Sequence, residues 1–317
     1  MKKWVIGFSV GIVLFLISIF VFIPNIIRLD RFATLNTTQD GLYRSLINNK
    51  DWSTWWPGNI PTETNSDSIL NYGYKKSTYH VTGTGYSNLM ILISGNNFIS
   101  KTSLTVIPQK TDTIILQWVA VIPTSFNPIK RLEIYFASHK LNKEMGTILE
   151  KIRTHFSNTE NIYHIKIKNE LVKDSFLVST FNKTKTYPSV NDIYSLINKL
   201  RNYIASQAAQ ETGFPMLNII KQDSITWLTK VAIPTNKSLE SSSDISFKRM
   251  LGFGKILMTE INGGPENIQK AFDEMGNYVN DYHYSLPAIP FESLVTDRTK
   301  EKDTSLWITR IYYPVMY

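Results

Sequence analysis

The hydrophobic residues of this chain follow three different patterns along its length. The first is an uninterrupted apolar run of twenty residues, Trp4–Ile23, which follows Lys2 and Lys3. Twenty helical residues rise about 30 Å, the thickness of the hydrocarbon core of a bilayer. A cleaved signal peptide has a shorter apolar region of about 7–15 residues and a small-residue cleavage site, which this run lacks. The run therefore predicts an uncleaved transmembrane signal anchor over residues 1–25.

The positive charges that flank this run predict its orientation. The N-terminal side carries the α-amino group with Lys2 and Lys3, and the other side carries Arg28 and Arg31. This slight bias favours an N-terminus in the cytoplasm. We therefore expect a single-pass protein of the cell membrane, with its C-terminal domains outside the cytoplasm and the lipid bilayer as a partner through residues 4–23.

The second pattern is a series of alternating or β-branched runs over residues 26–158. An extended stretch over Ile26–Leu35 precedes a short predicted helix over Gln39–Leu46. A closing helix is predicted over Leu141–Phe156, because its apolar residues recur every three or four positions. The runs between these helices that predict strands are Ser68–Lys76, Thr78–Tyr86, Leu89–Ser94, Phe98–Ile107, Thr113–Pro123 and Ile129–Ala137.

This order of elements and the W-x-x-W-W-P stretch at Trp52–Pro57 resemble the SRPBCC (START-like, polyketide cyclase) superfamily. The resemblance implies a helix-grip domain over residues 26–158, in which the long final helix lies across a curved antiparallel sheet and encloses an apolar cavity. Trp55 and Trp56 are then candidate ligand-binding residues. The alternative is that these tryptophans fill the core at the mouth of the sheet. No acidic pair and no ordered His/Asp set marks a catalytic centre here.

The third pattern is an internal repeat within residues 159–317. Trp227–Pro234 is matched by Trp307–Pro314, and both read W-[LI]-T-[KR]-[VI]-x-x-P. Upstream, the apolar stripe of one predicted helix, residues 193–204, recurs 75 residues later at residues 268–279. Five extra residues in the turn before Trp307 then raise the offset to 80. Agreement over a helix stripe and an eight-residue strand indicates a duplication.

Each copy of the repeat, about 174–236 and 249–317, reads as strand, helix, strand, strand. Pro188-Ser189 with Asp192 predicts a capped start for the first helix, and Gly263-Gly264-Pro265 predicts the start of the second. Two such copies can share an antiparallel sheet about a pseudo-twofold axis, with a groove between the two helices. The predicted fold class is α+β, with an N-terminal transmembrane helix, a helix-grip domain and this duplicated β-α-β-β domain.

Four motifs carry a further resemblance, and they are Gly213-Phe214-Pro215, Val231-Ala232-Ile233-Pro234, Pro290-Phe291-Glu292 and the closing segment Trp307–Val315. With this layout they are similar to the GyrI-like small-molecule-binding domain, a family that includes the effector-binding domains of bacterial transcription activators. The resemblance implies an aromatic ligand groove with a glutamate on the strand after the second helix, here Glu292. No helix-turn-helix segment precedes this domain, so we expect no nucleic acid among the partners.

The repeat itself also singles out Glu292. At the offset of 75 residues, Glu292 corresponds to Leu217, so one copy carries a carboxylate where the other carries an apolar residue. An unpaired charge in a core is costly. Either the asymmetry exposes Glu292, or the carboxylate is there to bind a cationic or hydrogen-bonding ligand. Trp227, Trp307 and Tyr313 alternate onto one strand face and Tyr312 onto the other, and we treat all four as candidate ligand-binding residues.

Composition narrows the chemistry further. The 317 residues include 34 Lys and Arg against 26 Asp and Glu, a net charge of +8 without a long basic run. The chain has no Cys, which excludes disulfides, thiolate catalysis and iron–sulfur clusters. Its five His residues are dispersed, so we expect no metal site and no cofactor. No residue is assigned a catalytic role.

Three functions fit these features. We expect a membrane-anchored sensor or sequestration protein that binds lipophilic small molecules, including cations, in the GyrI-like groove, with a second apolar cavity in residues 26–158. One alternative is a GyrI-like hydrolase that uses Glu292 as a general base. The other is a non-catalytic membrane scaffold whose pockets are unused. A sensor would need an unidentified membrane partner, because a cytoplasmic stub of residues 1–3 is too short to signal.

Overall fold

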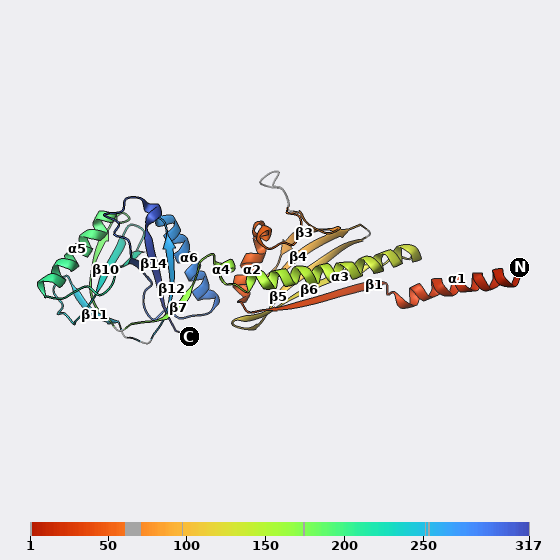
Figure 1. Cartoon of the computed structure of the whole chain (residues 1–317), viewed down its shortest axis with the longest axis horizontal. Helices are drawn as coiled ribbons and strands as arrows, with labels where there is room; N and C mark the ends of the chain where they lie inside the picture. Colours follow the sequence, from red (N-terminus) through yellow and green to blue (C-terminus); the bar gives the residue numbers. More distant parts are fainter. Residues whose placement is uncertain are drawn as a thin grey trace. The chain divides into compact units, whose positions relative to one another are not determined.

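The computed structural model describes residues 2–60, 71–96, 98–173, 175–250, 252 and 254–316. The chain divides into two compact units, residues 1–162 and residues 163–317, which we call the N-terminal and the C-terminal unit (Figure 1). Each unit contains an antiparallel sheet and helices, so the fold class is α+β.

The chain begins with the helix α1 (Lys2–Phe22). No helix among the described residues is both long enough and apolar enough to cross a membrane. The end of α1 packs on the N-terminal unit: Ile19 is buried, and the Arg131 guanidinium lies 4.9 Å from the centre of the Phe20 ring. Arg131 also donates hydrogen bonds to the carbonyl oxygen of Ile23. These contacts attach the end of α1 to the rest of the N-terminal unit.

Several linked predictions are therefore wrong. They are the transmembrane anchor over residues 1–25, the bilayer as a partner through residues 4–23, and the single-pass localisation with its cytoplasmic N-terminus. The apolar run did predict a helix, and α1 ends at Phe22, two residues before Pro24. Hydrophobicity along the sequence does not reveal whether the end of such a helix lies against lipid or against protein.

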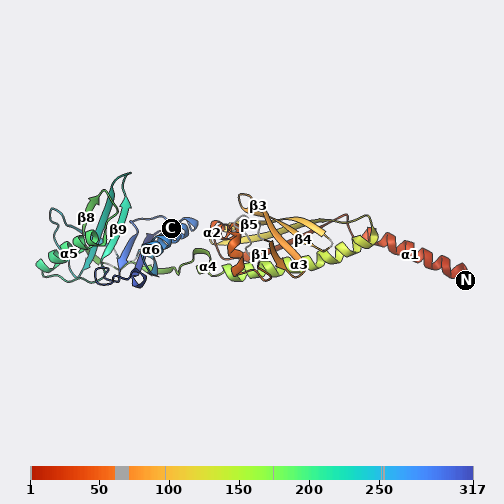
Figure 2. The ribbon, with the colours of Figure 1, turned by 90° about the horizontal axis from the view of Figure 1, so that it is seen from above.

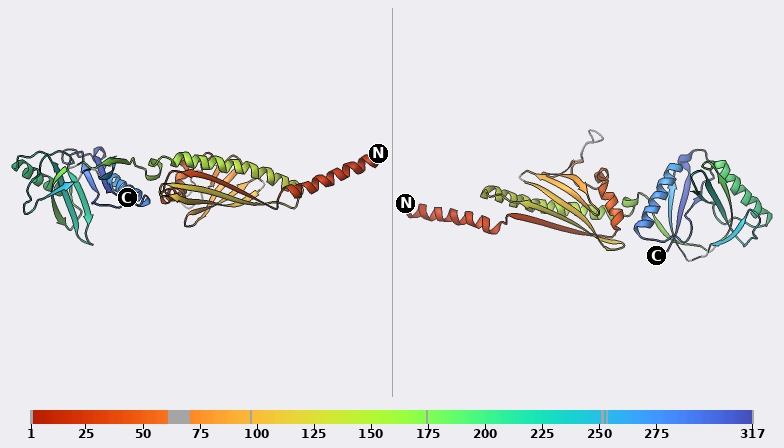
Figure 3. Two further views of the ribbon diagram at one scale, coloured as in Figure 1. Left: turned by 90° about the horizontal axis from the view of Figure 1, so that it is seen from below. Right: turned by 180° about the vertical axis from the view of Figure 1, so that it is seen from behind.

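The N-terminal unit is built around a six-stranded sheet with the order β1-β6-β5-β4-β3-β2. The helix α2 (Gln39–Ile47) and the short η1 (Asn49–Thr54) follow the first strand, and the long helix α3 (Pro128–Phe156) lies along the sheet (Figure 3). The short helix α4 (Glu160–Tyr163) follows α3. The strands are β1 (Ile26–Leu35), β2 (Asn71–Tyr74), β3 (Ser77–Thr84), β4 (Asn88–Gly95), β5 (Phe98–Lys110) and β6 (Thr113–Pro123).

One predicted strand in this unit is wrong. Residues 129–137 are helical and form the first turns of α3. The Asn127 side chain accepts hydrogen bonds from the backbone N–H groups of Ile129 and Lys130, and Pro128 occupies the first turn, which together set the helix start. The predicted strand over residues 68–76 begins outside the described residues, and β2 covers Asn71–Tyr74.

The C-terminal unit contains the order strand, helix, strand, strand twice in succession. The first copy runs β8 (Ser175–Thr184), α5 (Val190–Ser206), β9 (Met216–Lys221) and β10 (Trp227–Thr235), and the second runs β12 (Lys255–Asn262), α6 (Pro265–Asp281), β13 (Phe291–Leu294) and β14 (Ile308–Val315). With β7 (Lys168–Leu171) and β11 (Ser246–Met250) they form one eight-stranded antiparallel sheet. Its order is β11-β8-β10-β9-β13-β14-β12-β7, which reads as two mirrored halves.

The two copies meet where β9 pairs with β13. In this register Glu292 lies opposite Leu217, and Ser293 lies opposite Met216. Leu217 and Glu292 are equivalent positions of the repeat, so the pseudo-twofold axis passes between them. The sheet also has a feature that the repeat did not predict. The strand β7, which precedes the first copy, pairs at the edge of the second, and β11, which precedes the second copy, pairs at the edge of the first.

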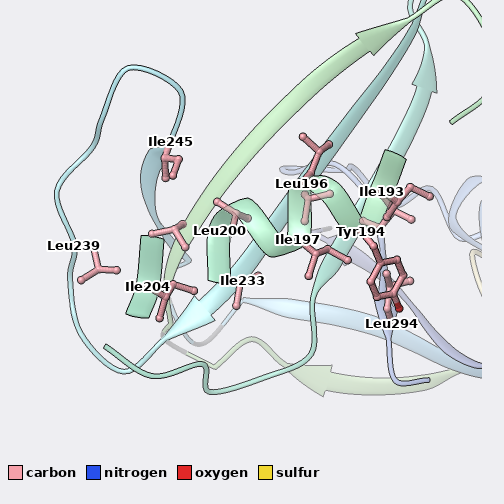
Figure 4. Packing of buried hydrophobic residues seen from close by; sticks show 13 residues of the cluster. Ile193, Tyr194, Leu196, Ile197, Leu200, Ile204, Ile233, Leu239, Ile245 and Leu294 are labelled. Carbon is pink, nitrogen blue, oxygen red and sulfur yellow. The ribbon is translucent and has the colours of Figure 1, made fainter. Parts of the chain in front are cut away.

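Both helices of the C-terminal unit lie on one face of the sheet, which we call the helix face (Figure 2). The start of α5 is a capping box in which Ser189 and Asp192 bond each other's backbone N–H groups. Gly263, with φ +123°, turns the chain into α6, and a side chain would be strained there. Beneath α5, an apolar cluster fills the first copy and includes Ile197, Leu217 and Ile233 (Figure 4).

Candidate functional site

Glu292 lies on the helix face at the centre of the eight-stranded sheet. Residues directly opposite each other on paired strands share a face, and Glu292 pairs with both Leu217 and Ile311. Leu217 packs in the cluster under α5, and Ile311 lies on the same strand face as Tyr313, whose hydroxyl bonds α6 at Phe272. The carboxylate is therefore on the side that both helices cover, and only 8% of Glu292 is exposed.

A cation from the same chain meets this carboxylate. Arg298, in the segment between β13 and β14, donates a hydrogen bond from Nη2 to Glu292 Oε2 at 2.7 Å. Counting the side-chain atoms alone, 7% of the Arg298 side chain and 11% of the Glu292 side chain are exposed, so both are almost fully buried. Charged pairs at this distance are stronger than neutral hydrogen bonds, and removal of either partner leaves an unpaired charge inside the protein.

Three further contacts fix Arg298. Its Nη2 donates to Thr309 Oγ1 at 3.0 Å, and its guanidinium carbon lies 4.7 Å from the centre of the Trp307 ring. Its backbone N–H donates to the hydroxyl of Tyr194 on α5 at 2.7 Å. Arg298 thus lies between the carboxylate of β13 and the face of an indole, and its backbone is fastened to the helix of the other copy.

Burial and charge act in opposite directions on this carboxyl. Burial raises the pKa of Glu292 above its usual value, and the charge and the hydrogen bond of Arg298 offset part of that rise. Burial and the Glu292 charge also raise the pKa of the Tyr187 hydroxyl, and the Arg298 charge offsets part of that rise. Tyr187 therefore lies within electrostatic reach of the pair. Its ring packs edge-on against Trp227, with ring centres 5.1 Å apart.

The first copy has no equivalent of this ion pair. Between the equivalent residues Leu217 and Trp227 the first copy has five residues fewer than the second copy has between Glu292 and Trp307, the part that carries Arg298. Thr229 is the repeat equivalent of Thr309, and its buried Oγ1 has no hydrogen-bond partner among the described residues. The longer segment of the second copy thus brings in the cation that satisfies both Glu292 and Thr309.

The predicted aromatic residues of the C-terminal unit occupy three different environments. Trp307 is buried against Arg298, and Trp227 is half-buried beside Tyr187 and 5.7 Å from the Lys221 ammonium. Tyr313 is buried under α6. Tyr312 lies on the opposite face of the sheet and stacks on Phe291 at 5.1 Å. Of these four aromatic residues, only Trp307 has a described contact with the ion pair, and the ligand-binding role of all the predicted residues stays a prediction.

In the N-terminal unit, Trp55 and Trp56 belong to a buried aromatic cluster. Their rings lie 5.7 Å apart, and both lie within 5.6 Å of Trp52. Trp56 Nε1 donates to the carbonyl oxygen of Gly73, whereas the buried Trp55 Nε1 has no partner among the described residues. These contacts are those of core residues, and a ligand-binding role for either tryptophan remains untested.

Sequence reasoning missed the residues that complete the Glu292 environment, namely Arg298, Thr309, Tyr187 and Tyr194. A signal for Arg298 was present, because the five-residue insertion and the Leu-to-Glu difference occur in the same copy. Tyr194 comes from α5 of the other copy, and only the three-dimensional pairing of the copies brings it to Arg298. No cluster of three potential metal ligands occurs among the described residues.

Comparisons with known proteins concern the fold alone. No protein-family model matches the chain, and no curated protein is significantly similar to it. Among solved structures, it is similar to EcmrR in a complex with DNA, with a TM-score of 0.43, 17% identity, and coverage of 60% of this chain and 72% of that one. A hydrolase from Listeria innocua has a TM-score of 0.37 and 11% identity, over 48% of this chain and 92% of that chain.

An aromatase/cyclase, Zhui, from a Streptomyces species has a TM-score of 0.31 and 9% identity, over 41% of this chain and 96% of that chain. The DNA in the first structure is bound by EcmrR. The expectation that nucleic acid is absent from the partners of this chain is not supported.

Proposed function

We propose that the C-terminal unit is a small-molecule-binding module whose ligand binds at Glu292 on the helix face. The observation that carries this proposal is the Glu292–Arg298–Trp307 arrangement, in which a buried carboxylate and an indole face hold one cation between them. The equivalent core position in the other copy is Leu217, so the stability of the fold does not by itself require a charge at Glu292.

The chemistry of the arrangement favours a lipophilic cation as the ligand. Such a ligand would offer the carboxylate a positive charge and would offer Trp307 a surface for cation–π attraction of about 0.5–2 kcal/mol. Both interactions are made by Arg298 in the structure. The ligand would therefore take the place of the guanidinium, and Arg298 would act as an internal competitor for the site.

The position of Arg298 supports an exchange of this kind. It lies in the connection between β13 and β14, outside the strands of the sheet, and nearby residues such as Thr299 and Lys300 are exposed. The bond from its backbone to Tyr194 keeps the segment attached while the side chain changes place. Movement of the side chain would leave the pairing of β13 with β9 intact.

Calorimetric titration of the full chain with tetraphenylphosphonium, a lipophilic monocation, tests this function. We expect Glu292→Gln to weaken binding by roughly tenfold or more, because the variant loses the charge that attracts the cation. We expect Arg298→Gln to strengthen binding by a similar factor, because it removes the competing cation. Triphenylphosphine oxide, which is neutral, should bind all three proteins with the same affinity.

Glu260→Gln is the matched control, because Glu260 pairs with Arg310 at 2.7 Å but is 45% exposed. This variant makes the same chemical change at another glutamate–arginine pair and should bind the cation as the natural chain does. Equal losses for the cation and the neutral compound on Glu292→Gln would contradict the charge-based site. So would an Arg298→Gln protein that binds the cation no more tightly.

A further inference from the structure

The face of the eight-stranded sheet that lies opposite the helices carries a cavity of its own. This face, which we call the back face, presents the side chains that alternate with Leu217 and Glu292, among them Met216 and Phe291. The cavity has a volume of about 850 Å³, within the range of small-molecule sites. All its lining residues belong to the C-terminal unit.

The floor of this cavity is apolar. It is formed by side chains from both copies of the repeat, with Met216 and Ala232 from the first and Phe291 and Pro314 from the second. Met250 adds a flexible side chain from the edge strand β11. Methionine side chains adapt to irregular apolar shapes, so the floor suits a flexible hydrocarbon chain.

The charges at the cavity have one sign. Lys230 and Lys248 line it from the back face, and none of the described residues that line it is acidic. Lys230 lies on β10 and is half-buried, and Lys248 lies on the edge strand opposite Leu177. Two lysines beside an apolar floor create a positive potential that attracts an anionic group.

A neighbouring hollow on the same face provides a contrast. Its volume is about 570 Å³, and it is lined by acidic as well as basic residues, including Glu170 and Glu260. Glu260 pairs with Arg310 at 2.7 Å, so charges of both signs are already matched there. Of these two, the larger cavity is the one that combines an apolar floor with lining charges of a single sign.

The geometry points to a second binding site in this cavity, one that takes a single-chain amphiphile with an anionic head group, such as a long-chain carboxylate. The hydrocarbon chain would lie over Met216, Ala232 and Phe291, and the carboxylate would lie among Lys230 and Lys248. This preference is opposite in sign to that of the Glu292 environment on the other face. The inference does not rest on the function proposed for Glu292.

Titration of the full chain with dodecanoate and with dodecyltrimethylammonium, both below their micelle concentrations, tests the site. The two probes have the same chain length and opposite charge. We expect dodecanoate to bind at least tenfold more tightly, and its affinity to fall as salt is added. The double variant Lys230→Gln, Lys248→Gln should lose roughly tenfold for dodecanoate, as expected when two partly exposed charge contacts are removed.

Three matched variants complete the test. Lys270→Gln removes a lysine on α6, which does not line the cavity, and should leave dodecanoate affinity within about twofold of the natural value. Glu292→Gln should also leave it unchanged, which separates this site from the proposed function. Ala232→Phe fills the floor and should weaken both probes.

Two results of the titrations would overturn the inference. One is equal affinity for the anionic and the cationic probe, and the other is a double lysine variant that binds dodecanoate as the natural chain does. Vesicles of phosphatidylglycerol test whether the cavity instead binds the anionic lipids of a membrane surface. Binding to these vesicles without binding of dodecanoate would equally contradict a site for a free single-chain amphiphile.

Discussion

The two copies of the repeat in the C-terminal unit have the same backbone layout and different interiors. Under α5, the first copy closes over an apolar cluster that includes Leu217, at 1% exposure. Across the axis, the second copy places Glu292 at the equivalent position and holds it with Arg298. The fold therefore tolerates either an apolar residue or a matched ion pair at this place, which means that the ion pair is not required to build it.

The difference also shows how a polar interior can arise after duplication. A glutamate alone at the position of Leu217 would be a buried charge without a partner. The longer connection that leads to Trp307 supplies Arg298, and Arg298 also bonds Thr309. In the first copy the shorter connection leaves Thr229 without a partner among the described residues. The charge, its partner and the additional residues of the segment thus form one linked change.

The largest expected effect comes from breaking the pair on its acidic side. Glu292→Gln leaves Arg298 buried without a countercharge, and we expect the free energy of unfolding to fall by about 3–5 kcal/mol. Urea unfolding measures this change. Glu260→Gln, at the exposed pair with Arg310, should cost less than about 1 kcal/mol. Similar losses in both variants would show that burial does not distinguish the two pairs.

Making the second copy apolar like the first should recover that loss. The double variant Glu292→Leu, Arg298→Met removes both charges, and similar replacements of buried ion pairs are neutral or stabilising by about 1–4 kcal/mol. We expect it to be at least as stable as the natural chain in urea and to bind tetraphenylphosphonium poorly. A double variant that is as unstable as Glu292→Gln would indicate that the second copy needs the ion pair to fold.

Breaking the pair on its basic side should give a smaller and pH-dependent effect. Burial already raises the pKa of Glu292, and Arg298→Gln removes the influence that lowers it. The folded variant then binds the proton of Glu292 more tightly than the unfolded chain does, so its stability rises as pH falls toward about 4.3, the ordinary pKa of glutamate. We expect a loss of about 2–3 kcal/mol near neutral pH, and less near pH 5.

The measurement is urea unfolding at several pH values, with Arg310→Gln as the control. Arg310 pairs with Glu260 at the surface, so its removal should cost little and should give a difference that does not change with pH. A loss for Arg298→Gln that is constant from pH 5 to about 8 would contradict the buried, proton-binding carboxyl.

The smallest effects should come from the two equivalent threonines. Thr309→Val removes the hydroxyl that accepts from Arg298 and should cost about 1.5–3 kcal/mol, the usual value for a hydrogen bond to a charged group. Thr229→Val removes a buried hydroxyl without a partner among the described residues and should be neutral or slightly stabilising. Thermal unfolding of both variants would show the contrast. Equal costs at the two positions would mean that the copies do not differ as described.

Sequence reasoning predicted the parts of the fold that depend on periodicity. Both helix starts of the C-terminal unit and β1 (Ile26–Leu35) agree with the structure. It failed for residues 129–137, where the N-cap at Asn127 and the following Pro128 decide in favour of a helix. It also failed for residues 1–25, because an apolar run does not reveal what the end of its helix contacts.

The candidate site could be predicted in part. The repeat identified Glu292 through its asymmetry with Leu217, but the sequence did not show which group pairs with the carboxylate. Arg298 is six residues from Glu292, whereas Tyr194 is 104 residues from Arg298. Contacts at such separations follow from strand order and from the docking of helices, and a pattern along one strand does not contain them.

The exchanged edge strands β7 and β11 make the two copies a single co-folding body. A fragment that ends near residue 240 would contain β7 without β12, its partner, and would lack the β11 that completes the sheet beside β8. Each isolated copy would expose a strand edge that can pair with another chain. Separate expression of the copies would thus yield intertwined dimers or aggregates. Since Lys255 must find Leu171 across 84 residues of chain, the sheet also closes late in folding.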